Sequence, residues 1–246
     1  MYFKFLFISL ALAISCLPLT NAYADNQGST IHIAVIDDIP STTMAVRLLE
    51  AAYARLGLSM QTLVSPSRRA LLMADTGQLD GDLFRIEAVA SDYPNLLKVN
   101  YPLLEGGLYA VIRNPHAQKL PEPSDKPLKV AVRRGVIIAE KTAEALGMEP
   151  VHTESYEQIR TLLEWGRVDL ALASDIEGLS PLATGDWSQF SVLPEPITRF
   201  TLHHYLNRTH ASLAEKLADE LAEMDKEGLK ARLRKLTLSE QKDGEW

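Results

Sequence analysis

The chain has 246 residues, enough for one large domain or two small ones. Hydrophobic residues make up 46% of it and charged residues 23%, values typical of a folded protein and not of a disordered or collagen-like chain. The formal net charge of −7 argues against nucleic acid as a partner, because binding to phosphates needs a basic surface.

The first 24 residues have the features of a secretory signal peptide. An almost wholly apolar run, Phe5 to Leu17, is shorter than the roughly 20 residues that a spanning helix needs. The small-x-small pattern that signal peptidase accepts follows at residues 22–24. We expect cleavage after Ala24 and export to the periplasm. An uncleaved membrane anchor and lipid attachment at Cys16 are the alternatives.

Cleavage would change the charge and remove the cysteine. Lys4 is the only charged residue among the first 24, so its loss would take the net charge from −7 to −8. Cys16 is the only cysteine of the chain. The mature protein would therefore have no disulfide, no thiol nucleophile and no thiolate metal site.

From residue 31 the sequence alternates between stretches typical of strands and of helices. Apolar residues of the stretch 42–56 recur every three or four positions, as in an amphipathic helix, and Gly57 is a typical helix end. Ser65 and Pro66 predict the start of a second helix, with Ser65 as its N-cap. This alternation predicts a parallel sheet with helices on its faces. The expected elements are strands at 31–36, 58–64 and 80–84 and helices at 42–56 and 65–77.

The same order of elements returns after Pro127. Ser155 and Gln158 form the pattern of a capping box, which predicts that a helix begins there. Residues 65–80 and 155–169 also share a longer pattern: a helix, a glycine, a polar residue, an apolar residue and an aspartate before a strand. We interpret the two halves as two lobes of one architecture. The expected elements are strands at 128–132, 149–153 and 168–173 and helices at 135–146 and 155–166.

Three further segments predict how the lobes are connected. Prolines are so frequent in residues 114–127 that neither a helix nor a central strand is expected there. The stretches 107–113 and 200–206 predict strands that cross between the lobes. A helix predicted at 212–236, broken near Gly228, has no strand after it and must pack on an existing lobe. We expect a signal peptide of residues 1–24, a first lobe of residues 25–112 plus 205–246, and a second lobe of residues 113–204.

Four short motifs, combined with this order of elements, point to a known family. They are Gly77-Gln78-Leu79-Asp80-Gly81, Gly166-Arg167-Val168-Asp169, Tyr101-Pro102-Leu103 and Met224-Asp225-Lys226-Glu227-Gly228-Leu229. The chain resembles the family 3 extracellular solute-binding proteins, the amino-acid-binding branch of ABC-transporter receptors. The resemblance implies a type II periplasmic-binding-protein-like α/β fold, with two lobes joined by two crossing hinge strands.

The resemblance also implies a function. A small-molecule ligand would bind in the cleft between the lobes, without a cofactor, and the lobes would close over it by a hinge motion. The receptor would then deliver the ligand to an inner-membrane ABC permease. The same lobes would alternatively serve as the ligand-sensing input of a membrane receptor. We expect a monomer in either case.

The chain departs from the family where ligands are usually held. The family's Pro-Pro-aromatic turn is replaced by Asp37-Asp38-Ile39-Pro40, and no arginine occurs at Ala90 to Tyr93, where the family holds an amino acid's carboxylate. The family's Gly-Thr-Thr turn corresponds to Gly135-Val136-Ile137, and its acidic residue for the amino group would fall at Ser174 or Asp175. These departures leave the ligand open.

Ligands of open α/β sheets bind beyond the carboxyl ends of the strands, where helix amino termini favour anions. Arginines at such places in an acidic chain indicate a small polar ligand, anionic or amino-acid-like, because a guanidinium matches a carboxylate. Arg85 is the candidate for the family's missing arginine; alternatively, these arginines are solvated or paired with carboxylates. Asp80 and Asp169 start their strands, away from the cleft, and are expected to be turn or cap residues. The candidate ligand-binding residues are Asp37, Asp38, Ser67, Arg68, Arg69, Arg85, Tyr109, Arg134, Gly135, Ser174 and Asp175.

An enzyme is the alternative from another class. His203 and His204 are adjacent on a predicted strand, so they face opposite sides and cannot share one metal ion. The sequence has no zinc-protease motif, no Gly-x-Ser-x-Gly elbow and no phosphate-binding glycine loop. We therefore expect no catalytic residues, no metal and no cofactor.

Overall fold

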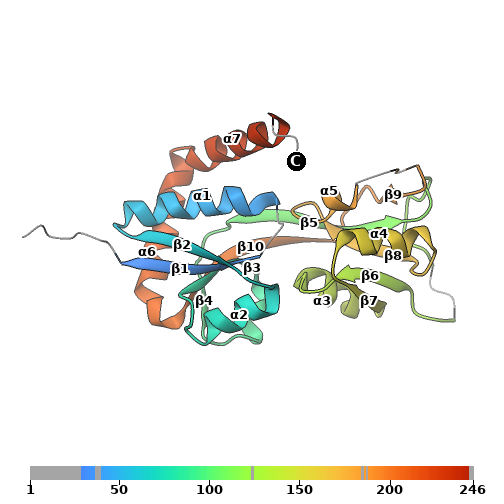
Figure 1. The fold of residues 1–246 in the computed structure, drawn as a ribbon, viewed down its shortest axis with the longest axis horizontal. Coiled ribbons are helices and arrows are strands. Elements are labelled where there is room, and N and C mark those ends of the chain that lie inside the picture. The colour runs from blue at the N-terminus through green and yellow to red at the C-terminus, as the bar shows by residue number, and fades with distance from the viewer. Residues whose placement is uncertain (1–28, 37–39, 123–124, 184–185, 187, 244–246) are drawn as a thin grey trace, which may run out of the picture.

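The computed structural model describes residues 29–36, 40–122, 125–183, 186 and 188–243. In this part of the chain, ten strands form one sheet that runs through two α/β lobes (Figure 1). The strand order is β2-β1-β3-β10-β5-β8-β6-β7, with β4 paired to β10 and β9 paired to β5. The architecture of two lobes joined by two crossing strands is the one that the sequence predicts.

The first lobe combines the beginning and the end of the chain. Its strands are β1 (Thr30–Val35), β2 (Ser59–Val64), β3 (Gly81–Ile86) and β4 (Leu96–Lys98). Its helices are α1 (Pro40–Arg55), α2 (Ser67–Asp75), the 3-10 helices η1 (Glu87–Ser91) and η2 (Arg208–His210), α6 (Ala211–Lys226) and α7 (Leu229–Asp243). β1 pairs in parallel with β2 and β3. Alternate residues of β1 pack on opposite faces, Ile33 with the α1 side and Ala34 with α2.

The second lobe contains β6 (Lys129–Arg133), α3 (Ile137–Ala145), β7 (Glu149–Thr153), α4 (Tyr156–Glu164), β8 (Leu170–Ser174), α5 (Leu179–Leu182) and β9 (Ser191–Val192). Its sheet is covered on both faces, as the alternation of side chains requires. Val130 and Val132 pack with the α3 side, whereas Ala131 packs with Ile159 and Leu163 of α4.

The strands β5 (Leu104–Ile112) and β10 (Thr198–Asn207) connect the lobes. They pair with each other only between Leu104–Leu108 and Thr198–Leu202. Beyond that segment, β5 pairs with β8 over Leu108–Ile112, and β10 pairs with β3 of the first lobe. β5 is therefore anchored in the sheet of the second lobe and β10 in the sheet of the first, and the short pairing between these two strands joins the lobes, which is the arrangement that a hinge needs.

The last two helices return to the first lobe. α6 and α7 pack against α1 (Figure 1), with Leu217, Leu221 and Met224 of α6 buried in the first-lobe core. The predicted break falls at Gly228, where the backbone has a φ of +74°. No described helix is long and apolar enough to cross a membrane.

The starts of two predicted helices are wrong: α3 begins at Ile137 and not at Gly135, and α2 begins later than expected as well. The second helix begins at Ser67, and Pro66 rather than Ser65 stands at its N-cap. The extended backbone of Pro66, with φ −54° and ψ 140°, delays the helix start. The hydroxyl of Ser67, the first helical residue, donates instead to a backbone oxygen of the second lobe.

Candidate functional site

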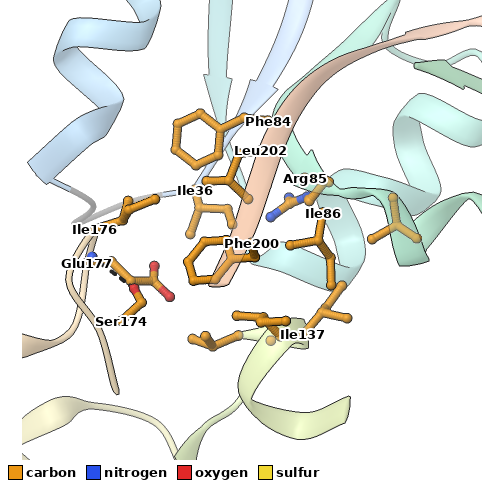
Figure 2. A pocket seen from close by; sticks show the side chains of 14 residues that line it. Ile36, Phe84, Arg85, Ile86, Ile137, Ser174, Ile176, Glu177, Phe200 and Leu202 are labelled. Atoms are coloured by element: carbon orange, nitrogen blue, oxygen red, sulfur yellow. Dashed lines mark hydrogen bonds between the residues drawn. The ribbon is translucent and has the colours of Figure 1, made fainter. Parts of the chain in front are cut away.

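A small cavity lies between the lobes, beside the crossing strand β10 (Figure 2). The first lobe contributes the ends of β1 and β3, and the second contributes the turn from β6 to α3 and the turn after β8. The cavity volume is about 60 Å³. Its lining residues are Ile36, Phe84, Arg85, Ile86, Val89, Gly135, Val136, Ile137, Ile138, Ser174, Ile176, Glu177, Phe200 and Leu202.

Most of this wall is apolar, with isoleucines from both lobes and Phe200 from the crossing strand (Figure 2). Charged side chains come from two places, Arg85 near the end of β3 and Glu177 after β8. An apolar lining with a few convergent polar groups is typical of small-molecule sites. The polar groups therefore decide which ligand fits.

Arg85 is buried and points its guanidinium toward the cavity (Figure 2). Its Nη2 donates to Asp82 Oδ2 at 2.7 Å and to the backbone oxygen of Ser67 at 3.4 Å. Burial raises the pKa of the Asp82 carboxyl, although the charge of Arg85 opposes that rise. The Arg85 Nε is buried and has no hydrogen-bond partner among the described residues. A buried unpaired donor is costly, so a ligand acceptor at this position would be strongly favoured.

Glu177 is the site residue that the sequence reasoning missed. Its backbone N–H donates to Ser174 Oγ at 3.1 Å, so the chain turns after β8 and brings the Glu177 side chain to the cavity (Figure 2). Burial raises the pKa of its carboxyl, against the nearby positive charges of Arg133 and Arg85. The sequence does contain a signal for it, because Glu177 is an acidic residue about one helical turn beyond the predicted strand end. It lies close to Ser174 and Asp175, where the resemblance places the family's acidic residue.

The lobes also touch directly. The buried Ser67 Oγ donates to the Gly135 oxygen at 2.8 Å. Next to it, Arg68 pairs with Glu140 at 2.5 Å, and Glu140 also accepts the Gly135 N–H at 2.9 Å. These bonds join the start of α2 to the turn before α3, so the two lobes are in direct contact at this edge of the cavity.

The other candidates divide into three groups. Arg85, Gly135 and Ser174 line the cavity. Ser67 does not line it but is hydrogen-bonded to Gly135, which does. Arg68, Arg69, Arg134 and Tyr109 do not line it; Arg134 is exposed and pairs with Glu154 at 2.7 Å. Asp37 and Asp38 lie outside the described residues. The assignment of all these residues to a ligand stays a prediction.

A larger and more polar cleft adjoins the cavity, with a volume of about 750 Å³. It shares Ile86, Ile138 and Phe200 with the small cavity. Asp175, a further candidate, lines this cleft, and its Oδ1 accepts the N–H of Gly107 on β5 at 2.9 Å. Asp175 therefore ties the second lobe to the hinge strand.

Comparison with known proteins supports this fold. No family model matches the chain, so membership of family 3 stays a prediction. A histidine kinase sensor domain with similarity to periplasmic binding proteins superposes with a TM-score of 0.71 at 18% identity, covering 87% of this chain and 97% of that one. The GluR0 ligand-binding core in complex with L-glutamate gives 0.69 at 14% identity (85% and 98% covered). An ancestral arginine-binding protein bound to arginine gives 0.65 at 15% identity (85% and 98% covered).

These likenesses confirm the predicted fold class, a periplasmic-binding-protein-like fold. One relative is similar in sequence as well. An uncharacterized protein of Shewanella oneidensis is 30% identical over 216 residues, which span 81% of this chain and 79% of that protein. The chain therefore belongs to the family of this Shewanella protein, with a periplasmic-binding-protein-like fold.

Proposed function

We propose that the protein is an exported solute-binding receptor that closes its two lobes over a small amino-acid-like ligand and releases it unchanged. The observation that carries this proposal is the pair of opposed groups in the inter-lobe cavity, the unpaired Nε of Arg85 and the carboxylate of Glu177.

These two groups suit a zwitterion. A ligand carboxylate would accept from the buried Arg85 Nε, and a ligand ammonium group would donate to the half-buried Glu177 carboxylate. The isoleucines and Phe200 between them would hold a small apolar side chain. The proposed ligand is thus amino-acid-like, which is one part of the range that the sequence predicts.

Binding would require the lobes to open. The contacts of Ser67 with Gly135 and of Arg68 with Glu140 hold the lobes together beside the cavity. The strands β5 and β10 would allow opening because β5 is anchored in the second lobe and β10 in the first, and the two strands pair with each other only over a short segment. The ligand would then shift the balance toward the closed form by the contacts that it makes only there.

Two roles suit such a receptor in the periplasm. Uptake through an ABC permease is the role we propose, in line with the resemblance to transport receptors. A sensing role is the second candidate, because a sensor domain of a histidine kinase is among the similar structures. Deletion of this protein would abolish growth on the ligand in the first case and a transcriptional response to it in the second.

The test is a thermal-shift screen of the purified protein with amino acids, dicarboxylates and polyamines. A ligand at one hundred times its Kd stabilises a protein by about 2.7 kcal/mol, which is readily measured. Recovery of the ligand unchanged after incubation would support binding without turnover. No stabilisation by any amino acid would contradict the proposal.

A further inference from the structure

Asp82 and Arg85 pair across an irregularity in β3. In a regular strand, residues three apart point to opposite faces. Here Arg85 lies opposite His203 of β10 and Asp82 lies opposite Tyr205, so β3 takes three steps where β10 takes two. This extra residue is a β-bulge, and it turns Asp82 to the same side as Arg85.

The pair removes the net charge of Arg85. Asp82 is 1% exposed and Arg85 is 5% exposed, so water and salt screen their attraction little. The guanidinium keeps its Nε free to donate one hydrogen bond, but its positive charge is already balanced. Glu177 adds a negative charge on the other side of the cavity, and the positive charge of Arg133 lies near it. An anionic ligand would therefore meet one donor but no net positive charge.

We propose that Asp82 determines the ligand specificity of the cleft: by neutralising Arg85, it makes the site select zwitterions and reject anions of the same shape. This inference rests on the proposed function, because it requires the acceptor group of the ligand to meet Arg85. Asp82 does not touch the ligand. It acts through Arg85, and its removal would turn Arg85 into an uncompensated cation.

The experiment compares ligands that differ in charge and little in shape. The probes are L-alanine, L-leucine and L-phenylalanine, each with its amide, which is cationic, and its 2-oxo acid, which is anionic. Isothermal titration of the wild-type protein is expected to give the tightest binding for one of the zwitterions. In Asp82→Asn, the preference for that zwitterion over its 2-oxo acid should fall by about tenfold or more.

The controls separate specificity from folding. Asp219→Asn, at an exposed site on α6, changes the net charge equally and should leave the preference unchanged. If Asp82→Asn does not fold, Asp82→Asn with Arg85→Gln removes both buried charges. That double variant should lose the zwitterion without gaining the 2-oxo acid, and a gain would contradict the inference.

The outcomes also separate the two proposals. If no probe binds, or if only the amides bind, both the proposed function and this inference are overturned. Binding of a zwitterion with the same charge preference in the wild type and in Asp82→Asn would overturn the inference alone. So would wild-type binding of a 2-oxo acid as tight as that of its zwitterion.

Discussion

Asp80 and Asp169 have the same place and the same role in the two lobes. Each precedes a strand, and its carboxylate accepts a backbone N–H of the neighbouring strand, from His32 in one lobe and Lys129 in the other, both at 2.7 Å. This confirms that they are cap residues away from the cleft, as the repeated sequence pattern predicts. Among the described residues, His210 Nε2 lies 2.8 Å from Asp80, whereas no histidine pairs with Asp169.

The partners of Asp80 predict a pH dependence. Burial raises the pKa of its carboxyl, but the hydrogen bonds from His32 and His210 lower it more, so the net pKa is lowered. Because the pKa is lower in the folded state, the charged carboxylate stabilises the fold at pH values above the pKa of the unfolded state, near 4. This stabilisation is lost as the pH falls through the pKa of the folded state. Asp80→Asn should cost about 1–2 kcal/mol at pH 7 and less at pH 3, which lies below the unfolded pKa.

Urea unfolding of the wild type and the variant at both pH values measures this difference. Asp169→Asn is the matched control, because it removes the charge of a carboxylate that accepts the same kind of backbone bond but has no histidine partner among the described residues. An equal cost of Asp80→Asn at pH 7 and pH 3 would contradict the role of the charged carboxylate.

The sequence was informative for site residues that depend on position alone. Arg85 could be placed at the cleft because it follows a predicted strand, and Gly135 because it stands in a strand-to-helix turn. The pairing of Arg85 with Asp82 could not be predicted, since it depends on a bulge that shifts the side-chain alternation of β3. Glu177 was missed for a similar reason, because the turn after β8 moves the acidic position by one helical turn.

At the scale of elements, a buried histidine of β10 stabilises the bulge in β3. His204 is buried opposite the bulge; its Nδ1 is 3.0 Å from the Leu83 oxygen and its Nε2 is 2.8 Å from the Tyr53 hydroxyl. A carbonyl oxygen only accepts, so Nδ1 carries the proton, and Nε2 accepts from Tyr53. Burial lowers the pKa of His204 to about 4, so the ring is neutral at pH 7.

Replacing His204 should therefore weaken the fold in a pH-dependent way. His204→Phe keeps the ring volume but leaves the Leu83 oxygen and the Tyr53 hydroxyl unpaired, a cost of about 2–4 kcal/mol at pH 7. In the wild type the unfolded state takes up a proton near pH 6.5 and the folded state only near 4, so stability should fall as the pH drops between these values. The variant should lack that part of the decline.

Denaturant unfolding between pH 7 and pH 4 checks both statements. Tyr53→Phe is the control, since it removes one hydrogen bond and keeps the titrating ring. A variant with the same pH profile as the wild type would show that His204 does not titrate as its burial implies.

Long helices and strands with a clear periodic spacing of apolar residues were predictable from the sequence, whereas short elements were not. The capping box at the start of α4 is confirmed, with Ser155 Oγ accepting from the Gln158 N–H at 3.2 Å. The helix α5 and the strands β4 and β9 have four residues or fewer and no periodic pattern. They form because longer elements lie beside them, which a local pattern does not record.

At the scale of the whole molecule, the contact between the lobes depends on Gly135. Its φ is +83°, and a Cβ added there would lie 2.8 Å from the Cβ of Ser67 in the other lobe. No sequence pattern predicts this approach, because the two residues lie 68 positions apart and meet only when the lobes close. Gly135 is thus needed for the backbone of its own turn and for closure.

Gly135→Ala should hold the lobes apart. Gly147→Ala is the matched control, because Gly147 has a φ of +65° and nothing within 4 Å of its added Cβ. Both variants should lose roughly 1 kcal/mol of stability from the backbone, but only Gly135→Ala should increase the radius of gyration in solution scattering and weaken ligand binding. Adding Ser67→Gly removes the opposing Cβ and should restore closure in part, without the Ser67 hydrogen bond. Equal scattering and affinity for the two alanine variants would mean that the lobes do not close through this contact.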